Sequence, residues 1–486
     1  MTMIGIYDDR CRVADEARAV LGIARYGRLV FRKRSLRDHH RDLLLAAGCE
    51  RVVVIEDDAD FDRLAHERGL ERSRLLWWPS SLACRDQTAG RLFLLKFHHV
   101  QEDFSVAPAP GGTSSALLAL GGASARRILV SDPLRSDLAG RGPGETMVAV
   151  PAPPWLADLT RRDQLVDLAS STFDVRHFNA ISQDELLVVK RSSDVTKMRR
   201  EARYYEQLPS VMRVFFLPAL DYREEGGTAC YATERIRVPD LSLQWIHRAL
   251  DERSFPPLLG RLGDFLRLRP VRTPDAAAGR RQAEALYLGK TEQRLAQLSA
   301  HAAWPQIAAL LAHCGPADGM AGLHRRFLAQ WARLTPRRRV WRTAVSHGDP
   351  CFSNILYHPD TRLLKFIDPR GAETPDELHL DEYYDVAKLS HSILGLYDLV
   401  NHDLADLHLG RALHLELVHG GADLAPLQAQ FRAAVAAWGL DLHLVRLYEA
   451  ALFLSMLPLH ADVPKKVVCF ALTAADILAR LERDEP

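Results

Sequence analysis

Three oxygen-bearing side chains follow one another at short intervals in this chain, and their types suit phosphate and metal chemistry. Asp349 is followed five residues later by Asn354, and Asp368 lies fourteen residues beyond Asn354. An Asp and an Asn separated by only five residues predict a tight loop. The apolar run 363–367 predicts a buried strand that ends at Asp368. Phosphoryl transfer from ATP needs such a set, because one carboxylate orients the attacking hydroxyl while an amide and a second carboxylate hold Mg²⁺.

The run His347-Gly348-Asp349, with Asn354 and a strand-terminal Asp368 after it, resembles the motif of the aminoglycoside phosphotransferase and choline kinase family. That family is a small-molecule branch of the protein-kinase-like fold. The resemblance implies that Asp349 is catalytic and that Asn354 and Asp368 bind Mg²⁺. His347 would shape the loop and take no part in proton chemistry. The residue types alone also fit an Asp/Asn turn that leads into a hairpin, with Asp368 as a solvated strand end.

A kinase-like fold also needs a lysine for the phosphates and a glutamate that holds this lysine. Residues 185–190 predict an apolar strand that ends in Lys190, and residues 199–208 predict a helix. A compact ammonium at a strand end can sit between phosphates and a carboxylate where a guanidinium would crowd.

The resemblance assigns the two roles to particular residues. It implies that Lys190 contacts the α- and β-phosphates and that Glu201 holds it. Lys197 remains an alternative for the lysine, and Glu206 an alternative for its partner.

Two further parts of a kinase are implied by the resemblance. Residues 228–236 predict the last strand of the small lobe and its hinge, whose backbone would hold the adenine edge at Glu234, Arg235 and Ile236. Asp385 would brace the catalytic loop, and it could also be the N-cap of the helix that follows it.

Two departures from the family pattern are visible. No glycine-rich loop precedes Lys190, since the expected turn, residues 181–185, contains no glycine. Pro369 and Arg370 follow Asp368, where protein kinases have Phe. Without a glycine-rich loop, Ser182 or backbone amides would have to cover the γ-phosphate.

Length and composition describe a globular chain of several domains. At 486 residues it suggests two to four domains, and 47% hydrophobic with 26% charged residues can bury a large core. A net charge of +1 gives no electrostatic reason to expect nucleic acid or an anionic membrane as a partner. The seven cysteines include no Cys-x-x-Cys pair, and no apolar run approaches ~20 residues. We expect a cytoplasmic protein with reduced thiols and no membrane span.

The expected fold class is α+β. Residues 174–238 would form a small β-rich lobe and residues 239–486 a helical lobe that carries the catalytic and Mg²⁺-binding loops, as in the two-lobed protein-kinase-like fold. Residues 1–155 are expected to form a separate α/β domain, with a helix at 36–47 and strands at 29–31, 51–55, 92–97 and 127–130. Pro/Gly/Ser-rich patches interrupt it at 107–115 and mark its end at 140–154.

Residues 27–55 faintly resemble a unit of the sugar-nucleotide pyrophosphorylases. The nucleotide-gripping loop of that fold is not recognisable, and residues 5–10 would take its place. We therefore expect a scaffold or a surface for a protein partner. Asp57, Asp58 and Asp60 could bind a metal, but a solvated acidic strand end is the favoured interpretation.

These patterns favour an ATP- and Mg²⁺-dependent kinase that phosphorylates a hydroxyl of a small molecule. A sugar is the preferred acceptor because of the N-terminal resemblance, followed by choline-like amino alcohols and by aminoglycosides. For an aminoglycoside, acidic residues are needed, and candidates are Asp376, Glu377, Asp381 and Glu382. The alternatives are a nucleotide-binding pseudokinase or assembly protein and, less favoured, an active nucleotidyltransferase with a kinase appendage.

Overall fold

The computed structural model describes residues 2–67, 70–98, 102–107, 116–121, 124, 147–170, 179–183, 186–314, 319–409, 415–419 and 424–485. The chain divides into two compact units, Met1–Thr172 and Phe173–Pro486, and both contain helices and strands. The expected strand 127–130 and most of the two Pro/Gly/Ser-rich patches lie outside the described residues.

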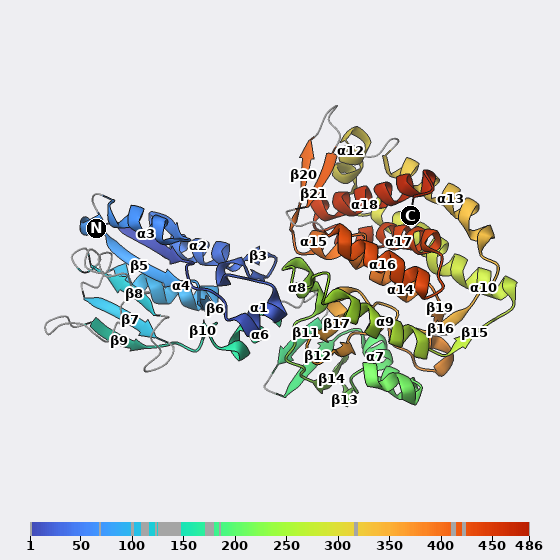
Figure 1. Ribbon diagram of the computed structural model, residues 1–486, viewed down its shortest axis with the longest axis horizontal. Helices are drawn as coiled ribbons and strands as arrows, with labels where there is room; N and C mark the ends of the chain where they lie inside the picture. Colours follow the sequence, from blue (N-terminus) through green and yellow to red (C-terminus); the bar gives the residue numbers. More distant parts are fainter. Residues whose placement is uncertain are drawn as a thin grey trace. The chain divides into compact units, whose positions relative to one another are not determined.

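The first unit is built on a six-stranded sheet with the order β4-β1-β5-β8-β7-β9 (Figure 1). Strands β4, β1 and β5 are parallel, β8 is antiparallel to both β5 and β7, and β9 is parallel to β7. The strands are β1 (Met3–Asp8), β4 (Arg51–Ile55), β5 (Arg74–Pro79), β7 (Asp103–Ala107), β8 (Leu117–Leu120) and β9 (Met147–Pro151). Short pairs are β2 (Val30–Phe31) with β3 (Arg34–Ser35), and β6 (Leu82–Cys84) with β10 (Leu156–Asp158).

Both faces of this sheet are covered, so its central strands are apolar on both sides. Tyr7 and Trp78 face one core, with α2 and α4, whereas Ile6 and Trp77 face the other, with α3. This alternation is the period of two that a strand imposes on its side chains. The helices of the unit are α1 (Asp15–Leu21), α2 (Leu36–Ala46), α3 (Asp58–Ala65), α4 (Gln87–Leu95) and α6 (Arg162–Ser170).

One expected strand of this unit is wrong. Residues 92–97 belong to α4 and to the 3-10 helix η3 (Lys96–His98), because Asp86 caps α4 by accepting a hydrogen bond from the N–H of Ala89. An apolar run of six residues does not distinguish a strand from a buried helix turn, and here the upstream cap decides.

Residues 5–10, which stand where pyrophosphorylases have their nucleotide-gripping loop, do not form such a loop here. Residues 5–8 lie inside β1, and the charges that follow it are paired: Arg10 lies 2.9 Å from Asp8, and Arg37 lies 2.9 Å from Asp9. The likeness to pyrophosphorylases therefore finds no support in this unit.

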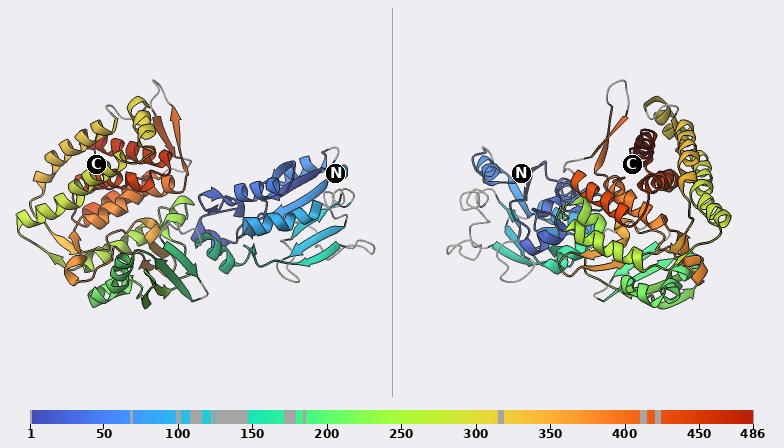
Figure 2. Two further views of the ribbon diagram at one scale, coloured as in Figure 1. Left: turned by 180° about the vertical axis from the view of Figure 1, so that it is seen from behind. Right: turned by 45° about the vertical axis from the view of Figure 1, so that its right-hand side comes forward.

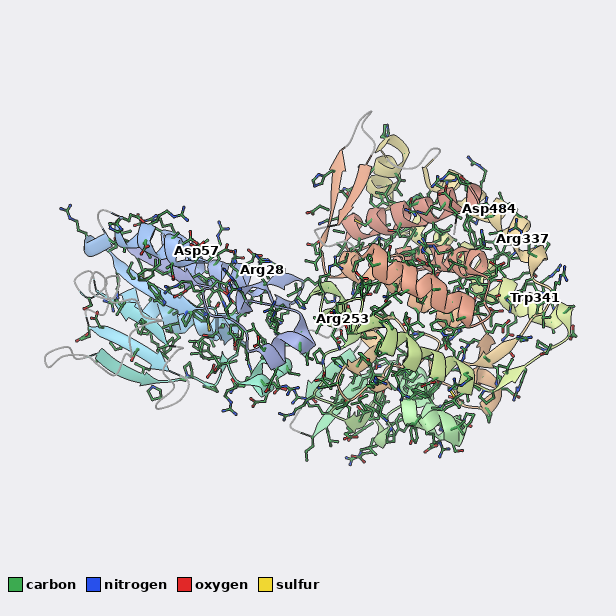
Figure 3. All side chains as sticks on the ribbon, viewed as in Figure 1. Arg28, Asp57, Arg253, Arg337, Trp341 and Asp484 are labelled. Carbon is green, nitrogen blue, oxygen red and sulfur yellow. The ribbon has the colours of Figure 1, made fainter. Side chains whose placement is uncertain are left out.

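The acidic run after β4 is a helix start. Asp57, labelled in Figure 3, lies at the start of α3. It caps the helix by accepting a hydrogen bond from the N–H of Asp60, and Asp60 in turn accepts one from the N–H of Glu56. Within the described part of the chain, no group of three or more His, Cys, Asp or Glu side chains could hold a metal ion.

The second unit begins with a four-stranded antiparallel sheet, in the order β11-β12-β14-β13, against which α7 packs (Figure 1). The strands are β11 (Asn179–Gln183), β12 (Leu187–Ser192), β13 (Leu220–Glu225) and β14 (Thr228–Glu234), and the helix is α7 (Val195–Gln207). Met198 and Ala202 of α7 share a small core with Ala229 and Tyr231 of β14.

The rest of this unit is mostly helical, and its layered helices are clear in Figure 2. Its helices are α8 (Leu241–Ile246), α9 (Phe255–Leu268), α10 (Ala276–Ala283), the π-helix η5 (Glu284–Gly289), α11 (Lys290–Ser299), α12 (Trp304–Cys314), α13 (Gly319–Leu334), α14 (Tyr384–Ile393), α15 (Tyr397–Asn401), α16 (Ala425–Ala437), α17 (Leu442–Met456) and α18 (Pro464–Glu482). Helix α17 packs against α14 and α18 in one large core.

Three small sheets lie among these helices. Their strands are β15 (Val271–Arg272), β16 (Thr343–Val345) and β19 (His379–Asp381), the hairpin β17 (Ile355–His358) with β18 (Leu363–Phe366), and the hairpin β20 (Ala405–Leu409) with β21 (Leu415–His419).

Among the described residues, one helical stretch, Leu442–His460, is long and apolar enough to cross a membrane by length and composition. Of its most apolar window, 72% is buried inside the protein. A helix buried in a protein core, as α17 is, has the same apolar composition, so the stretch is weak evidence for a membrane span.

Candidate active site

A buried ion pair joins β12 to α7. Lys190 Nζ lies 2.6 Å from Glu201 Oε2, and both residues are 5% exposed. The same Nζ lies 3.0 Å from Asp368 Oδ1. Burial alone would lower the pKa of Lys190, but Asp368 and Glu201 outweigh it and raise this pKa above its ordinary value. The ammonium is therefore charged and held between two carboxylates.

The geometry also separates the alternatives for this pair. Glu206 is exposed at the far end of α7. Lys197 approaches the other oxygen of Glu201 at 3.6 Å, with a side chain that is 49% exposed. The buried partner of Glu201 is Lys190.

One member of this cluster was missed in the sequence. Tyr231 of β14 donates a hydrogen bond of 3.0 Å to Glu201 Oε2. The ladder places Lys190 directly opposite Tyr231, so their side chains lie on one face of the sheet. That strand register was the only available signal, and it is not visible until the strands are paired.

The β17–β18 hairpin brings Asn354 and Asp368 together. Ile355 pairs with Phe366, and the N–H of Ile367 donates to the carbonyl of Asn354 at 3.0 Å. The Asn354 side chain donates through Nδ2 to the carbonyl of Asp349 at 2.8 Å, so Oδ1 is the atom that would meet a metal ion. The turn and hairpin that the residue types alone also fitted are therefore present. They position the side-chain oxygens of Asn354 and Asp368.

Asp368 has a backbone conformation uncommon for a residue with a side chain. Its φ is 54°, in the left-handed region, which Asp tolerates better than most residues. Its side chain is 47% exposed, so one carboxylate oxygen can meet Lys190 while the group remains accessible to a ligand.

The donor set suits Mg²⁺ rather than a metal with a complete protein cage. Asn354 and Asp368 supply only an amide and a carboxylate, and Mg²⁺ is commonly held by one or two carboxylates together with substrate phosphates and water. These two residues would hold the ion on the nucleotide.

His347 is a buried structural residue. Its Nδ1 accepts a hydrogen bond from the N–H of Asp349 at 3.0 Å, so Nε2 carries the hydrogen and donates to the carbonyl of Ile367 at 2.9 Å. Burial lowers the pKa of His347, and its ring stacks on Phe216. A neutral ring with both nitrogens engaged fits the expected loop-shaping role.

Asp385 binds the backbone of the loop that carries Asp349. Its Oδ2 accepts the N–H of His347 at 3.0 Å, and its Oδ1 accepts the N–H of Gly348 at 2.9 Å. Arg269, 5% exposed in its side chain, lies 3.3 Å from Oδ2 and was not recognised in the sequence. The possible N-cap role is wrong, because Tyr383 holds the cap position and Asp385 lies in the first turn of α14.

Gly348 is required by this packing. Its φ is +84°, and a Cβ placed there would lie 2.6 Å from the Cβ of Arg370. A side chain at this position would push apart the segments that carry Asp349 and Asp368.

Asp349 faces a lysine that was not singled out in the sequence. Lys388 of α14 places Nζ 2.9 Å from Asp349 Oδ1. Burial tends to raise the pKa of Asp349, but Lys388 outweighs this effect and lowers the pKa to about 2. Lys388 lies three residues after Asp385, on the same side of the helix, and that spacing was the available signal.

The three hinge candidates differ in what their backbone can offer. The N–H of Arg235 donates to the carbonyl of Leu186 at 2.8 Å, within the ladder to β12. The alternation of an antiparallel ladder turns the backbone polar groups of Glu234, the last residue of β14, away from β12. Ile236 lies beyond the strand, and its carbonyl accepts the N–H of Val238 at 2.9 Å. Of the turn expected to cover the γ-phosphate, residues 181–183 lie in β11, and 184–185 lie outside the described residues.

Comparison with known proteins gives structural neighbours but no sequence relative. No protein-family model and no curated protein matches the chain. The solved structures that match include a thermostable mutant of aminoglycoside phosphotransferase APH(4)-Ia without ligand, at 15% identity and a TM-score of 0.37, covering 63% of this chain and 94% of that one.

A ternary complex of the same enzyme with ADP and hygromycin B matches at 12% identity and a TM-score of 0.39, with 62% and 92% coverage. A GDP complex of a mutant aminoglycoside 2'-phosphotransferase-IIIa matches at 12% identity and a TM-score of 0.37, with 64% and 89% coverage. TM-scores this low do not bear on the activity of this chain, so function is inferred from the site itself.

Proposed function

We propose that this protein is an ATP- and Mg²⁺-dependent phosphotransferase that acts on a hydroxyl of a small molecule. The supporting observation is the joint placement of a Lys190–Glu201 ion pair and the Asp349, Asn354 and Asp368 loop, which are contributed by segments far apart in the sequence. The 3.0 Å contact between Lys190 and Asp368 links the two halves of the site. The four-stranded sheet with α7 would be the small lobe of a kinase-like fold and the helical part its large lobe.

Each residue has a role that its surroundings favour. The adenine edge would meet Glu234 and Ile236, and Lys190, held by Glu201, would contact the α- and β-phosphates. Mg²⁺ held by Asn354 and Asp368 would neutralise phosphate charge. Asp349 would orient the acceptor hydroxyl and receive its proton as the oxygen attacks the γ-phosphorus.

The acidic residues that would suit an aminoglycoside are engaged by arginines. Arg272 lies 2.6 Å from Asp376, and Arg200 lies 2.8 Å from Glu377. Arg338 contacts both Asp381 and Glu382, at 2.6 and 3.4 Å, and the side chain of Asp381 is only 3% exposed. These four carboxylates do not form an open acidic surface for a polycation. The preference for a sugar depended on a pyrophosphorylase likeness that has no support, so acceptors must be screened broadly.

The test is transfer of phosphate from Mg²⁺·ATP to hexoses, amino sugars, choline and aminoglycosides, followed by ³¹P NMR and by ADP release. We expect a new phosphate-ester signal with one acceptor class, absent with Asp349→Asn and in excess EDTA. Tight Mg²⁺·ATP binding with no transfer to any acceptor would contradict the proposal and favour a nucleotide-binding pseudokinase.

A further inference from the structure

Helix α14 contacts the loop of Asp349 through two charged side chains of opposite sign. Asp385, in its first turn, accepts the backbone N–H groups of His347 and Gly348. Lys388, one turn further on, lies 2.9 Å from the carboxylate of Asp349. The same rigid helix therefore fixes both the backbone of the loop and the functional end of its aspartate.

The two oxygens of Asp349 have different surroundings. Oδ1, the oxygen next to Lys388, is buried, whereas the side chain as a whole is 45% exposed. The contact with Lys388 is an ion pair rather than a well-aligned hydrogen bond. Oδ2 is thus the oxygen that remains accessible to an incoming molecule.

We propose that Lys388 is a positioning residue for phosphoryl transfer, which holds Asp349 through Oδ1 so that Oδ2 faces the acceptor hydroxyl. The inference rests on the proposed phosphotransferase function and adds a residue to it. In the transfer step, the acceptor O–H bond breaks and its proton passes to Oδ2. The acceptor oxygen forms a bond to the γ-phosphorus, and the bond from that phosphorus to the bridging oxygen breaks. ADP departs with that electron pair, and Lys388 keeps its proton throughout.

A neutral residue at position 388 would leave the buried Oδ1 of Asp349 without its ion-pair partner. The titratable groups that face Asp349 are Lys388 and His391 from α14, and His347 and Cys351 from its own loop. Lys388 lowers the pKa of Asp349 most, and burial raises it. Burial also lowers the pKa of both histidines, so neither supplies a lasting positive charge in its place.

The experiment compares Lys388→Met, Lys388→Gln and Lys388→Arg with the wild type, using the acceptor found in the transfer screen. Lys465→Met is the matched control, because Lys465 also pairs with aspartates, Asp403 and Asp406, on the surface of the same unit. We expect Met and Gln to lower kcat by about 10²-fold, the lower end of what proton transfer to a positioned base contributes. The KM for Mg²⁺·ATP should change little, and Arg should recover part of kcat because it restores the charge.

The split between kcat and KM, together with the recovery in Lys388→Arg, separates positioning from a general loss of structure, which would affect both parameters and would not be restored by the charge alone. A wild type that turns over, with both neutral variants within about threefold of its kcat, overturns the role of Lys388 and leaves the phosphotransferase intact. A wild type with no transfer overturns the proposed function itself, and the role with it. If Lys388→Met does not fold, the Gln and Arg variants carry the same comparison.

Discussion

Tyr231 and Glu201 are joined by a hydrogen bond of 3.0 Å that ends on the oxygen already paired with Lys190. Strand β14 and helix α7 thus fix the carboxylate from two sides, and α7 cannot shift along the sheet without breaking this contact. The arrangement holds the ammonium of Lys190 in one place, as a phosphate-binding lysine requires.

Replacing Glu201 should weaken nucleotide binding. Glu201→Gln removes the charged partner of Lys190, and a hydrogen bond to a charged group contributes about 1.5–3 kcal/mol. We expect the Kd for Mg²⁺·ATP, measured by calorimetry, to rise about 10- to 100-fold. Glu206→Gln is the control on the exposed end of the same helix and should leave the Kd unchanged. An equal effect of both substitutions would point to α7 as a whole rather than to the ion pair.

Replacing Asp349 should slow transfer severely while sparing nucleotide binding. Asp349→Asn keeps the shape of the side chain but cannot receive the acceptor proton, so kcat should fall by about 10²–10⁴-fold. The Kd for Mg²⁺·ATP should stay within a few-fold, because Lys190, Asn354 and Asp368 are unchanged. Asp360→Asn, in the exposed turn of the neighbouring hairpin, serves as the control. Full activity in Asp349→Asn would remove it from the catalytic role.

Asp385 is expected to stabilise the fold as well as the loop. It is fully buried, accepts two backbone N–H groups and lies beside the buried Arg269. Removing one partner of such a buried pair costs about 3–5 kcal/mol, so Asp385→Asn should lower the free energy of unfolding by about that amount in urea titrations. Asp376→Asn breaks an exposed pair with Arg272 and should cost about 0–1 kcal/mol. Similar losses in the two variants would show that burial is not what makes Asp385 important.

Stability should depend on pH through two carboxyls, Asp398, which is fully buried, and Asp240, which is partly buried and caps α8. Burial raises the pKa of Asp240 to about 7 and that of Asp398 to about 6. Between pH 4 and these values the unfolded chain has lost the two protons while the folded protein keeps them, so the folded state becomes less stable as pH rises. The slope is about 1.4 kcal/mol per pH unit for each retained proton.

The measurement is the free energy of unfolding of the wild type and of Asp398→Asn from pH 4 to 7. The variant has no proton to lose at this position, so its stability should fall less steeply between pH 4 and 6. Asp360→Asn should follow the wild type. Parallel curves for the wild type and Asp398→Asn would mean that Asp398 is ionised in the folded protein.

Local sequence patterns are informative where chemistry and spacing coincide. The sequence identifies Asp349, Asn354 and Asp368 as candidate site residues. Their oxygen-bearing side chains lie at a turn and at a strand end, and few arrangements other than one shared loop fit that spacing. The same patterns fail for residues 92–97, where an apolar run without alternation fits a helix as well as a strand, and the Asp86 cap lies outside the run.

By itself the sequence determined the residue types of the candidate site, the order in which they occur and the segments that carry them. Only the tertiary structure decided which of Glu201 and Glu206 meets Lys190, that Tyr231 supports the pair and that Lys388 lies against Asp349. These choices depend on the register of β12 against β14 and on the rotation of α7 and α14 about their axes. Both are set by packing between segments distant in the chain, and the periodicity of a single segment carries no information about its partner.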